Sequence, residues 1–189
     1  MIGAHRVEGY AIVSADGMIA DATGTIPNSL RNDADQRFLQ SEMDRAAVIV
    51  HGRHSSEGGP RAARRKRIVL TRRIAAVADD PPQPNTVLWN PAGAAFAQAL
   101  AAARVGNGGV IAILGGTGVF GLFLPLYDAF HLTRAAAVKI PQGRPVFPDV
   151  GAGVPPEEPL TRRGLVPGPR RDVDVAAGIS LVTWRRPQS

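Results

Sequence analysis

One carboxylate and one basic turn within residues 26–56 have the spacing to do chemistry. Asp33 stands at the start of a helical pattern whose other face is apolar. A short apolar strand then leads into the turn His51-Gly52-Arg53-His54-Ser55, which offers a glycine, basic side chains and a hydroxyl. A carboxylate that faces a pocket can favour protonation of one ligand. A glycine turn between a strand and a helix can hold the phosphates of another, so the stretch suits a site for two ligands.

Two further turns repeat this pattern after predicted strands. Gly115-Gly116-Thr117-Gly118 follows the apolar residues 109–114, and Thr71-Arg72-Arg73 ends another strand. The glycine turn lacks both the GxGxxG spacing with its later acidic residue and the Gly-Lys-Ser/Thr of a Walker loop. Open α/β folds bind ligands at the carboxyl ends of their strands, so we expect the three turns to converge there. Together with the carboxylate, they predict a reductase that uses a nucleotide cofactor.

The elements that must position these turns alternate between strands and helices, which predicts an α/β domain. The pattern predicts strands over residues 7–13, 46–51, 67–71, 86–89, 109–114, 129–133 and 178–184. It predicts helices from Leu30, with Asn28 or Ser29 as the N-cap, and over residues 91–103 and 119–126. Residues 139–170 are rich in proline and glycine, and we expect irregular loops there.

Composition narrows the classes of protein. The chain has no cysteine, which excludes disulfides and thiolate catalysis, and its four histidines show no metal-binding spacing. No apolar run approaches the roughly 18 residues of a membrane span, and residues 1–8 lack the design of a signal peptide. The net charge is +6, but no aromatic residues interleave with the basic run 61–67. We therefore expect a cytoplasmic protein that binds an anionic small molecule rather than nucleic acid or membrane.

Eight short segments, covering about residues 10 to 149, keep an order and spacing that match a known family. They are residues 15–19, 26–27, 30–33, 48–55, 65–71, 114–120, 131–133 and 147–149. In these segments the chain resembles the dihydrofolate reductase-like family, which also includes the reductase domain of bacterial riboflavin biosynthesis. The resemblance implies a single domain over residues 1–189, with a central, mostly parallel sheet flanked by helices.

The resemblance also implies an activity. It is the NADPH-dependent reduction of a 7,8-dihydropterin to its tetrahydro form by hydride transfer, as in one-carbon metabolism. The substrate would be dihydrofolate or a modified pterin such as dihydromethanopterin, and the protein would be a monomer or homodimer. Arginines in the phosphate turns favour the 2′-phosphate of NADPH over the hydroxyl of NADH.

Site residues carry over from the resemblance by position. The implied catalytic carboxylate is Asp33, held by Thr133. The implied substrate-binding residues are Ile12, Ile26, Asn28, Ala34, Phe38, Leu114 and, for the carboxylate of a folate tail, Arg65. The implied cofactor-binding residues are Ile19, Gly52, Arg53, His54, Ser55, Thr71, Arg72, Gly115, Gly116, Thr117, Gly118, Val119 and Phe120. Residues 18–26 form the candidate lid, with Gly17 and Gly24 as pivots.

Two departures from the family pattern leave alternatives open. Asn28 stands where the family has a tryptophan, and one extra residue separates Asp33 from Phe38. Asp35 is therefore the alternative pocket carboxylate. The substrate could instead be a ribosylaminouracil, as in the reductase of riboflavin biosynthesis. A non-catalytic, basic binding module is the alternative from another class.

Overall fold

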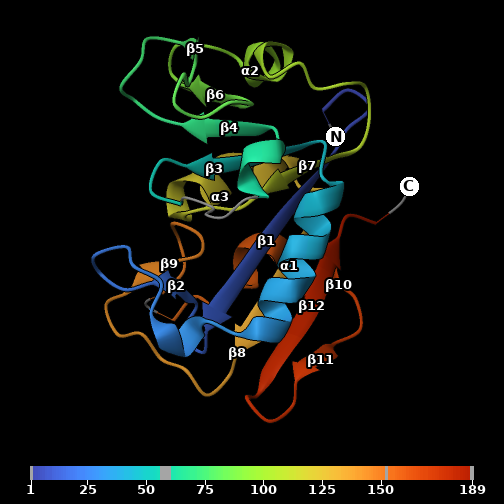
Figure 1. Cartoon of the computed structure of the whole chain (residues 1–189). Helices are drawn as coiled ribbons and strands as arrows, with labels where there is room; N and C mark the ends of the chain where they lie inside the picture. Colours follow the sequence, from blue (N-terminus) through green and yellow to red (C-terminus); the bar gives the residue numbers. More distant parts are fainter. Residues whose placement is uncertain (1, 56–60, 152, 188–189) are drawn as a thin grey trace.

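A twisted β-sheet crosses the molecule (Figure 1). The computed structural model describes residues 2–55, 61–151 and 153–187. In that part of the chain the strand order is β10-β12-β8-β1-β7-β3-β4-β6-β5, with β11 paired to β12. The strands are β1 (Arg6–Ser14), β3 (Val48–Gly52), β4 (Arg67–Leu70), β5 (Val77–Asp79), β6 (Thr86–Trp89), β7 (Val110–Ile113), β8 (Ala129–Ala135), β10 (Val166–Pro167), β11 (Arg171–Asp174) and β12 (Ile179–Arg185).

Parallel pairing dominates the centre of this sheet. β1 lies parallel to β7 and β8, and β3, β4 and β6 continue the parallel order beyond β7. β12 and β5 pair antiparallel with β8 and β6. The parallel strands end on one side, near a small second sheet of β2 (Met18–Ala20) and β9 (Arg144–Pro145) (Figure 1). The expected mostly parallel sheet is confirmed.

Successive strand residues point to opposite faces of the sheet. Helices cover both faces. Ile49 packs with Met43 of α1 (Asp33–Arg45), whereas Val50 belongs to the larger cluster with Phe120 and Phe123 of α3 (Thr117–Phe123). The other helices are α2 (Phe96–Ala102) and α4 (Glu158–Arg162), with 3-10 turns η1 (Asn28–Leu30), η2 (Ala62–Arg64) and η3 (Leu124–Leu126). None of the helices in the described residues is long and apolar enough to cross a membrane.

The start of α1 decides which of its residues face the sheet. The side-chain oxygen of Asn32 accepts hydrogen bonds from the backbone N–H groups of Ala34 (3.0 Å) and Asp35 (3.1 Å). Asn32 is therefore the N-cap, and the helix begins at Asp33. The expected start at Leu30 is wrong, because Asn28–Leu30 form a separate 3-10 turn. The shift changes the phase of the whole helix.

The other differences involve short or interrupted elements. Of the helix expected over residues 91–103, only α2 forms. The side chain of Asn90 accepts the N–H of Ala92, which holds the residues before α2 in a turn. The segment expected to be irregular, 139–170, contains β9, α4 and β10. Strands β2, β5 and β11 were also missed. Each has only two to five residues, too few to show a hydrophobic period.

Candidate active site

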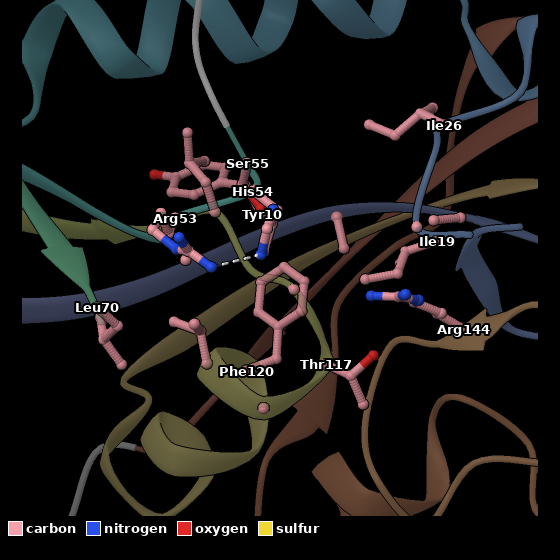
Figure 2. Close-up of a pocket in the computed structure, with 18 of the residues that line it drawn as sticks. Tyr10, Ile19, Ile26, Arg53, His54, Ser55, Leu70, Thr117, Phe120 and Arg144 are labelled. Atoms are coloured by element: carbon pink, nitrogen blue, oxygen red, sulfur yellow. Dashed lines mark hydrogen bonds between the residues drawn. The ribbon is translucent and has the colours of Figure 1, made fainter. Parts of the chain in front are cut away.

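A cavity of about 1210 Å³ opens at the carboxyl ends of β1, β3, β4 and β7, between α1 and α3. Its lining mixes apolar side chains with basic ones, which approach from more than one wall (Figure 2). Pockets for one drug-sized ligand have volumes of roughly 300–1,000 Å³. The cavity therefore has room for two ligands side by side.

Asp35 is the one acidic residue among the described residues that line the cavity. It is the third residue of α1 and is only 6% exposed. Its carboxylate is hydrogen-bonded to the side chain of Thr133 on β8, which is also buried. Burial raises the pKa of Asp35, and the hydrogen bond from Thr133 offsets this in part. The result is a carboxyl group held in one orientation at the cavity wall.

Asp33 lies outside the cavity, so its expected place as the pocket carboxylate is wrong. It is exposed and borders a shallow hollow on the outer side of α1, together with Arg37 and Arg61. Two residues along an α-helix correspond to a rotation of about 200°, so Asp33 and Asp35 cannot share a face. Because the cap is Asn32, the alternative carboxylate Asp35 faces the sheet.

Aromatic side chains form the inner wall beside Asp35. Tyr10 and His131 lie on neighbouring strands and stack at 4.5 Å between ring centroids, with Phe38 of α1 at 5.7 Å from His131. Glu8 accepts hydrogen bonds from the Tyr10 hydroxyl (2.9 Å) and from Nε2 of His131 (3.1 Å). Burial raises the pKa of Glu8, but these hydrogen bonds and the nearby charges, including that of Arg6, outweigh burial, and the net shift of the pKa is downward. Glu8 therefore fixes the orientation of both rings.

The turn after β3 and the turn after β7 are joined directly. The N–H of Gly52 donates to the carbonyl of Gly115 (2.9 Å), and the hydroxyl of Ser55 reaches the same carbonyl (3.5 Å). Arg53 and His54 extend from this turn and contact each other (3.1 Å), as Figure 2 shows. Basic and hydroxyl groups therefore gather at one end of the cavity.

The glycine turn before α3 needs glycine for steric reasons. Gly115 has a φ of +88°, and a Cβ added there would lie 2.3 Å from the ring of Phe120. The Gly115–Gly116 peptide bond is cis. The carbonyl of Gly116 accepts the N–H groups of Val119 and Phe120 (both 2.9 Å), which begins α3 directly at the cavity. The turn therefore presents backbone, without side chains, to this part of the cavity.

Comparison with solved structures identifies the fold. A riboflavin biosynthesis protein from Shewanella sp. PV-4 superposes with a TM-score of 0.61 at 18% identity, over 97% of this chain and 99% of that one. Dihydrofolate reductase from Enterococcus faecalis, in complex with NADP(H) and RAB-propyl, gives 0.60 at 19%, over 97% of each chain. The chain has the dihydrofolate reductase-like fold.

In a third comparison, this chain matches only part of a longer protein. The diaminohydroxyphosphoribosylaminopyrimidine deaminase/5-amino-6-(5-phosphoribosylamino)uracil reductase from Thermotoga maritima gives a TM-score of 0.63 at 15% identity, over 96% of this chain and 56% of that one. No family model and no curated protein matches the sequence. At these identities the likeness establishes the dihydrofolate reductase-like fold alone.

Most of the predicted site residues do line the cavity. They are Ile12, Ile19, Ile26, Phe38, Gly52, Arg53, His54, Ser55, Thr71, Arg72, Leu114, Gly116, Thr117, Gly118, Val119, Phe120 and Thr133. Their predicted roles stay predictions. Gly115 is not part of the lining, and its carbonyl accepts the N–H of Gly52.

Asn28, Ala34 and Arg65 do not line the cavity, contrary to expectation. Asn28 is exposed on η1, and Ala34 is turned aside by the helix phase that brings Asp35 inward. Arg65 is buried behind α1, where its guanidinium donates to the carboxylate of Asp44 (2.5 and 3.2 Å) and to the side chain of Gln40 (2.9 Å). The hydrogen bond from Arg65 lowers the pKa of Asp44.

Sequence reasoning missed several residues of the wall. They are Tyr10, Ala11, Ala20, Gln36, Leu39, Gln40, Leu70, His131 and Arg144. For Tyr10 and His131 the signal was available, because each lies two residues before a predicted site residue, Ile12 or Thr133, and so on the same face of its strand. Arg144 had no such signal. Among the described residues, no group of three His, Asp or Glu side chains could hold a metal ion.

Proposed function

We propose that the chain is an NADPH-dependent reductase that transfers a hydride to a C=N bond of a 7,8-dihydropterin. The observation that carries the proposal is the buried carboxylate of Asp35, held by Thr133 at the wall of a cavity with room for two ligands. The similar fold of a dihydrofolate reductase and of riboflavin-biosynthesis proteins supports it.

Asp35 suits the recognition and protonation of a pterin ring. The N–C–NH₂ edge of the ring offers two donors, and a carboxylate can accept both in charge-assisted hydrogen bonds. The negative charge then favours protonation of the acceptor nitrogen, which makes the adjacent carbon a better hydride acceptor. Thr133 keeps the carboxylate in the orientation that both tasks need. Tyr10, Phe38 and His131 would flank the flat ring.

The opposite end of the cavity suits NADPH, which supplies the hydride when bound. Arg53, Ser55 and Arg72 line this end, and guanidinium groups match the geometry of phosphate oxygens. At Gly116 the backbone lies open to the cavity: a Cβ added there would meet only Ile19, at 3.7 Å. These residues fit the phosphates and the close backbone approach of a dinucleotide.

The surroundings of Arg65 bear on the choice of substrate. A folate tail ends in a carboxylate, and Arg65 is the residue that the family resemblance assigns to it. Here the guanidinium of Arg65 already donates to Asp44 and to the side chain of Gln40, and Gln40 rather than Arg65 lines the cavity. A modified pterin that lacks the glutamate of the folate tail, such as dihydromethanopterin, therefore fits better than dihydrofolate.

A ribosylaminouracil of riboflavin biosynthesis is the second candidate substrate. Its ribose phosphate needs polar and basic neighbours rather than an apolar trough. Gln36, Gln40 and Arg144 provide such groups along the cavity. The same NADPH site and the same Asp35 would serve this reaction.

The test is NADPH oxidation by the purified protein with three substrates: dihydrofolate, dihydromethanopterin and the phosphorylated ribosylaminouracil. We expect turnover of dihydromethanopterin to exceed that of dihydrofolate. NADPH binding, measured by fluorescence, is the parallel readout. A protein that binds no NADPH and oxidises none with any of the three would be a binding module, and the proposal would be wrong.

A further inference from the structure

Arg144 enters the cavity from the wall opposite the basic turn after β3. It lies on β9 and pairs with Ala20 of β2. Figure 2 shows the side chains of Arg144 and Arg53 pointing toward the cavity from opposite sides. Both residues belong to the cavity lining. The cavity therefore has two separate cationic walls, and the proposed reduction of a dihydropterin by NADPH assigns a ligand group to only one of them.

One edge of the Arg144 guanidinium holds the candidate lid. Nε and Nη2 donate to the carbonyl of Ala22 (both 3.4 Å), and Nη2 also donates to the carbonyl of Thr23 (3.1 Å). Gly24 has a φ of +92°, and a Cβ added there would lie 2.9 Å from the guanidinium carbon. Gly24 and Ile26 in turn line the cavity. Arg144 is thus a direct link between β9 and the loop that borders the cavity.

The other edge of the guanidinium has no protein partner. Within residues 2–55, 61–151 and 153–187, Arg144 donates hydrogen bonds through Nε and Nη2 only, Nη1 makes none, and no carboxylate pairs with the side chain. The acidic residue of the described lining, Asp35, is hydrogen-bonded to Thr133 instead. Arg144 therefore presents an uncompensated positive charge and free N–H donors to the cavity.

We propose that Arg144 binds a phosphate group of the ligand and thereby ties residues 21–26 to it. The proposal rests on the proposed function. NADPH carries two separate anionic groups, the 2′-phosphate and the diphosphate, and the cavity offers two separate cationic walls. The glycine turn adjoins Arg144, since the hydroxyl of Thr117 donates to the carbonyl of Pro145. The diphosphate of NADPH therefore fits Arg144, and the phosphate of a ribosylaminouracil is the other source of the same chemistry.

The experiment compares Arg144→Gln and Arg144→Lys with the control Arg162→Gln. Arg162 is exposed, pairs with Glu158 on α4 and is not part of the cavity lining. The measurements are the Kd of NADPH and the hydrogen exchange of residues 20–27 with and without NADPH. We expect Arg144→Gln to weaken NADPH binding about tenfold or more, the effect of losing one charge-assisted contact. NADPH should slow exchange in residues 20–27 of the control and no longer do so in Arg144→Gln.

Arg144→Lys keeps the charge but loses the planar fork, so it should bind NADPH with intermediate affinity and still lose the protection of residues 20–27. A second arm compares the phosphorylated ribosylaminouracil with its dephosphorylated form at saturating NADPH. If Arg144→Gln weakens only the phosphorylated form, the phosphate that Arg144 binds belongs to the substrate. Unchanged Kd values and exchange in both arms would overturn the proposal while the proposed function stands. A wild-type protein that binds no NADPH would overturn both.

Discussion

At the scale of single residues, the side chain that caps α1 selects the pocket carboxylate. The sequence has two aspartates near the start of a helix, and the family resemblance favoured Asp33, with Asp35 as the alternative. The choice depends on which residue accepts the first N–H groups, and Asn32, Asn28 and Ser29 can all cap a helix. The structure shows Asn32 in that position. Asp35 then faces Thr133 and Asp33 faces solvent.

The burial of Asp35 predicts how the stability of the protein depends on pH. Its folded-state pKa is raised by desolvation, so the native protein binds more protons than the unfolded chain between the usual aspartate pKa and the raised value. Stability is therefore lost as the pH rises through that window. Asp35→Asn removes the ionising group, so its Tm relative to the wild type should increase from pH 4 to pH 8. Thermal unfolding of both proteins across this range is the measurement. A Tm difference that does not change with pH would show that Asp35 carries no raised pKa.

Arg53 makes a prediction about cofactor choice. If it contacts the 2′-phosphate of NADPH, Arg53→Ala should narrow the preference for NADPH over NADH by roughly tenfold or more, as expected for a contact of about 1.5–3 kcal/mol. Competition binding with the two cofactors gives the ratio. Arg64→Ala is the matched control, since Arg64 is exposed on η2 and is not part of the cavity lining. Equal binding of NADPH and NADH by the wild type would contradict the assignment.

At the scale of elements, the sequence could predict what depends on local chemistry. The three turns at Gly52, Thr71 and Gly115 converge as expected, because parallel strands of apolar residues end on the same side of a sheet. The strands β2 and β9 could not be predicted, because neither has enough residues to show a period. Their paired residues lie 124 (Ala20 and Arg144) and 127 (Met18 and Pro145) positions apart in the sequence, and only tertiary packing brings Arg144 to the cavity.

The glycine turn gives a prediction with an internal control. Gly115→Ala should destabilise the protein by at least about 2 kcal/mol, because the residue has a positive φ and the new Cβ would collide with Phe120. Gly118→Ala should be neutral or slightly stabilising, since Gly118 lies in α3 and an added Cβ meets nothing within 4 Å. Urea unfolding of the two variants measures the difference. Equal stabilities would mean that the turn can relax around a side chain.

At the scale of the whole molecule, the fold is retained at sequence identities of 15–19%. The hydrophobic pattern of the central strands and the backbone requirements of the turns are what the fold needs, and many sequences meet them. The side chains that face the cavity are freer to change than the core of the sheet. The hydrogen bond between Arg65 and Asp44 depends on residues far apart in the chain, and so does the position of Arg144 in the cavity. No local sequence pattern could reveal either of them.

The central claim is that Asp35 directs the reduction of a bound dihydropterin. The most direct measurement is single-turnover hydride transfer from NADPH across pH for Asp35→Asn, with Asp33→Asn as the matched control. Asp35→Asn should slow the chemical step by about 10²–10⁴-fold, the typical contribution of general acid–base catalysis. The loss should shrink at low pH, where the substrate arrives protonated. Asp33→Asn should react at the wild-type rate, and both variants should bind NADPH normally. Hydride transfer at the wild-type rate in Asp35→Asn would contradict the account.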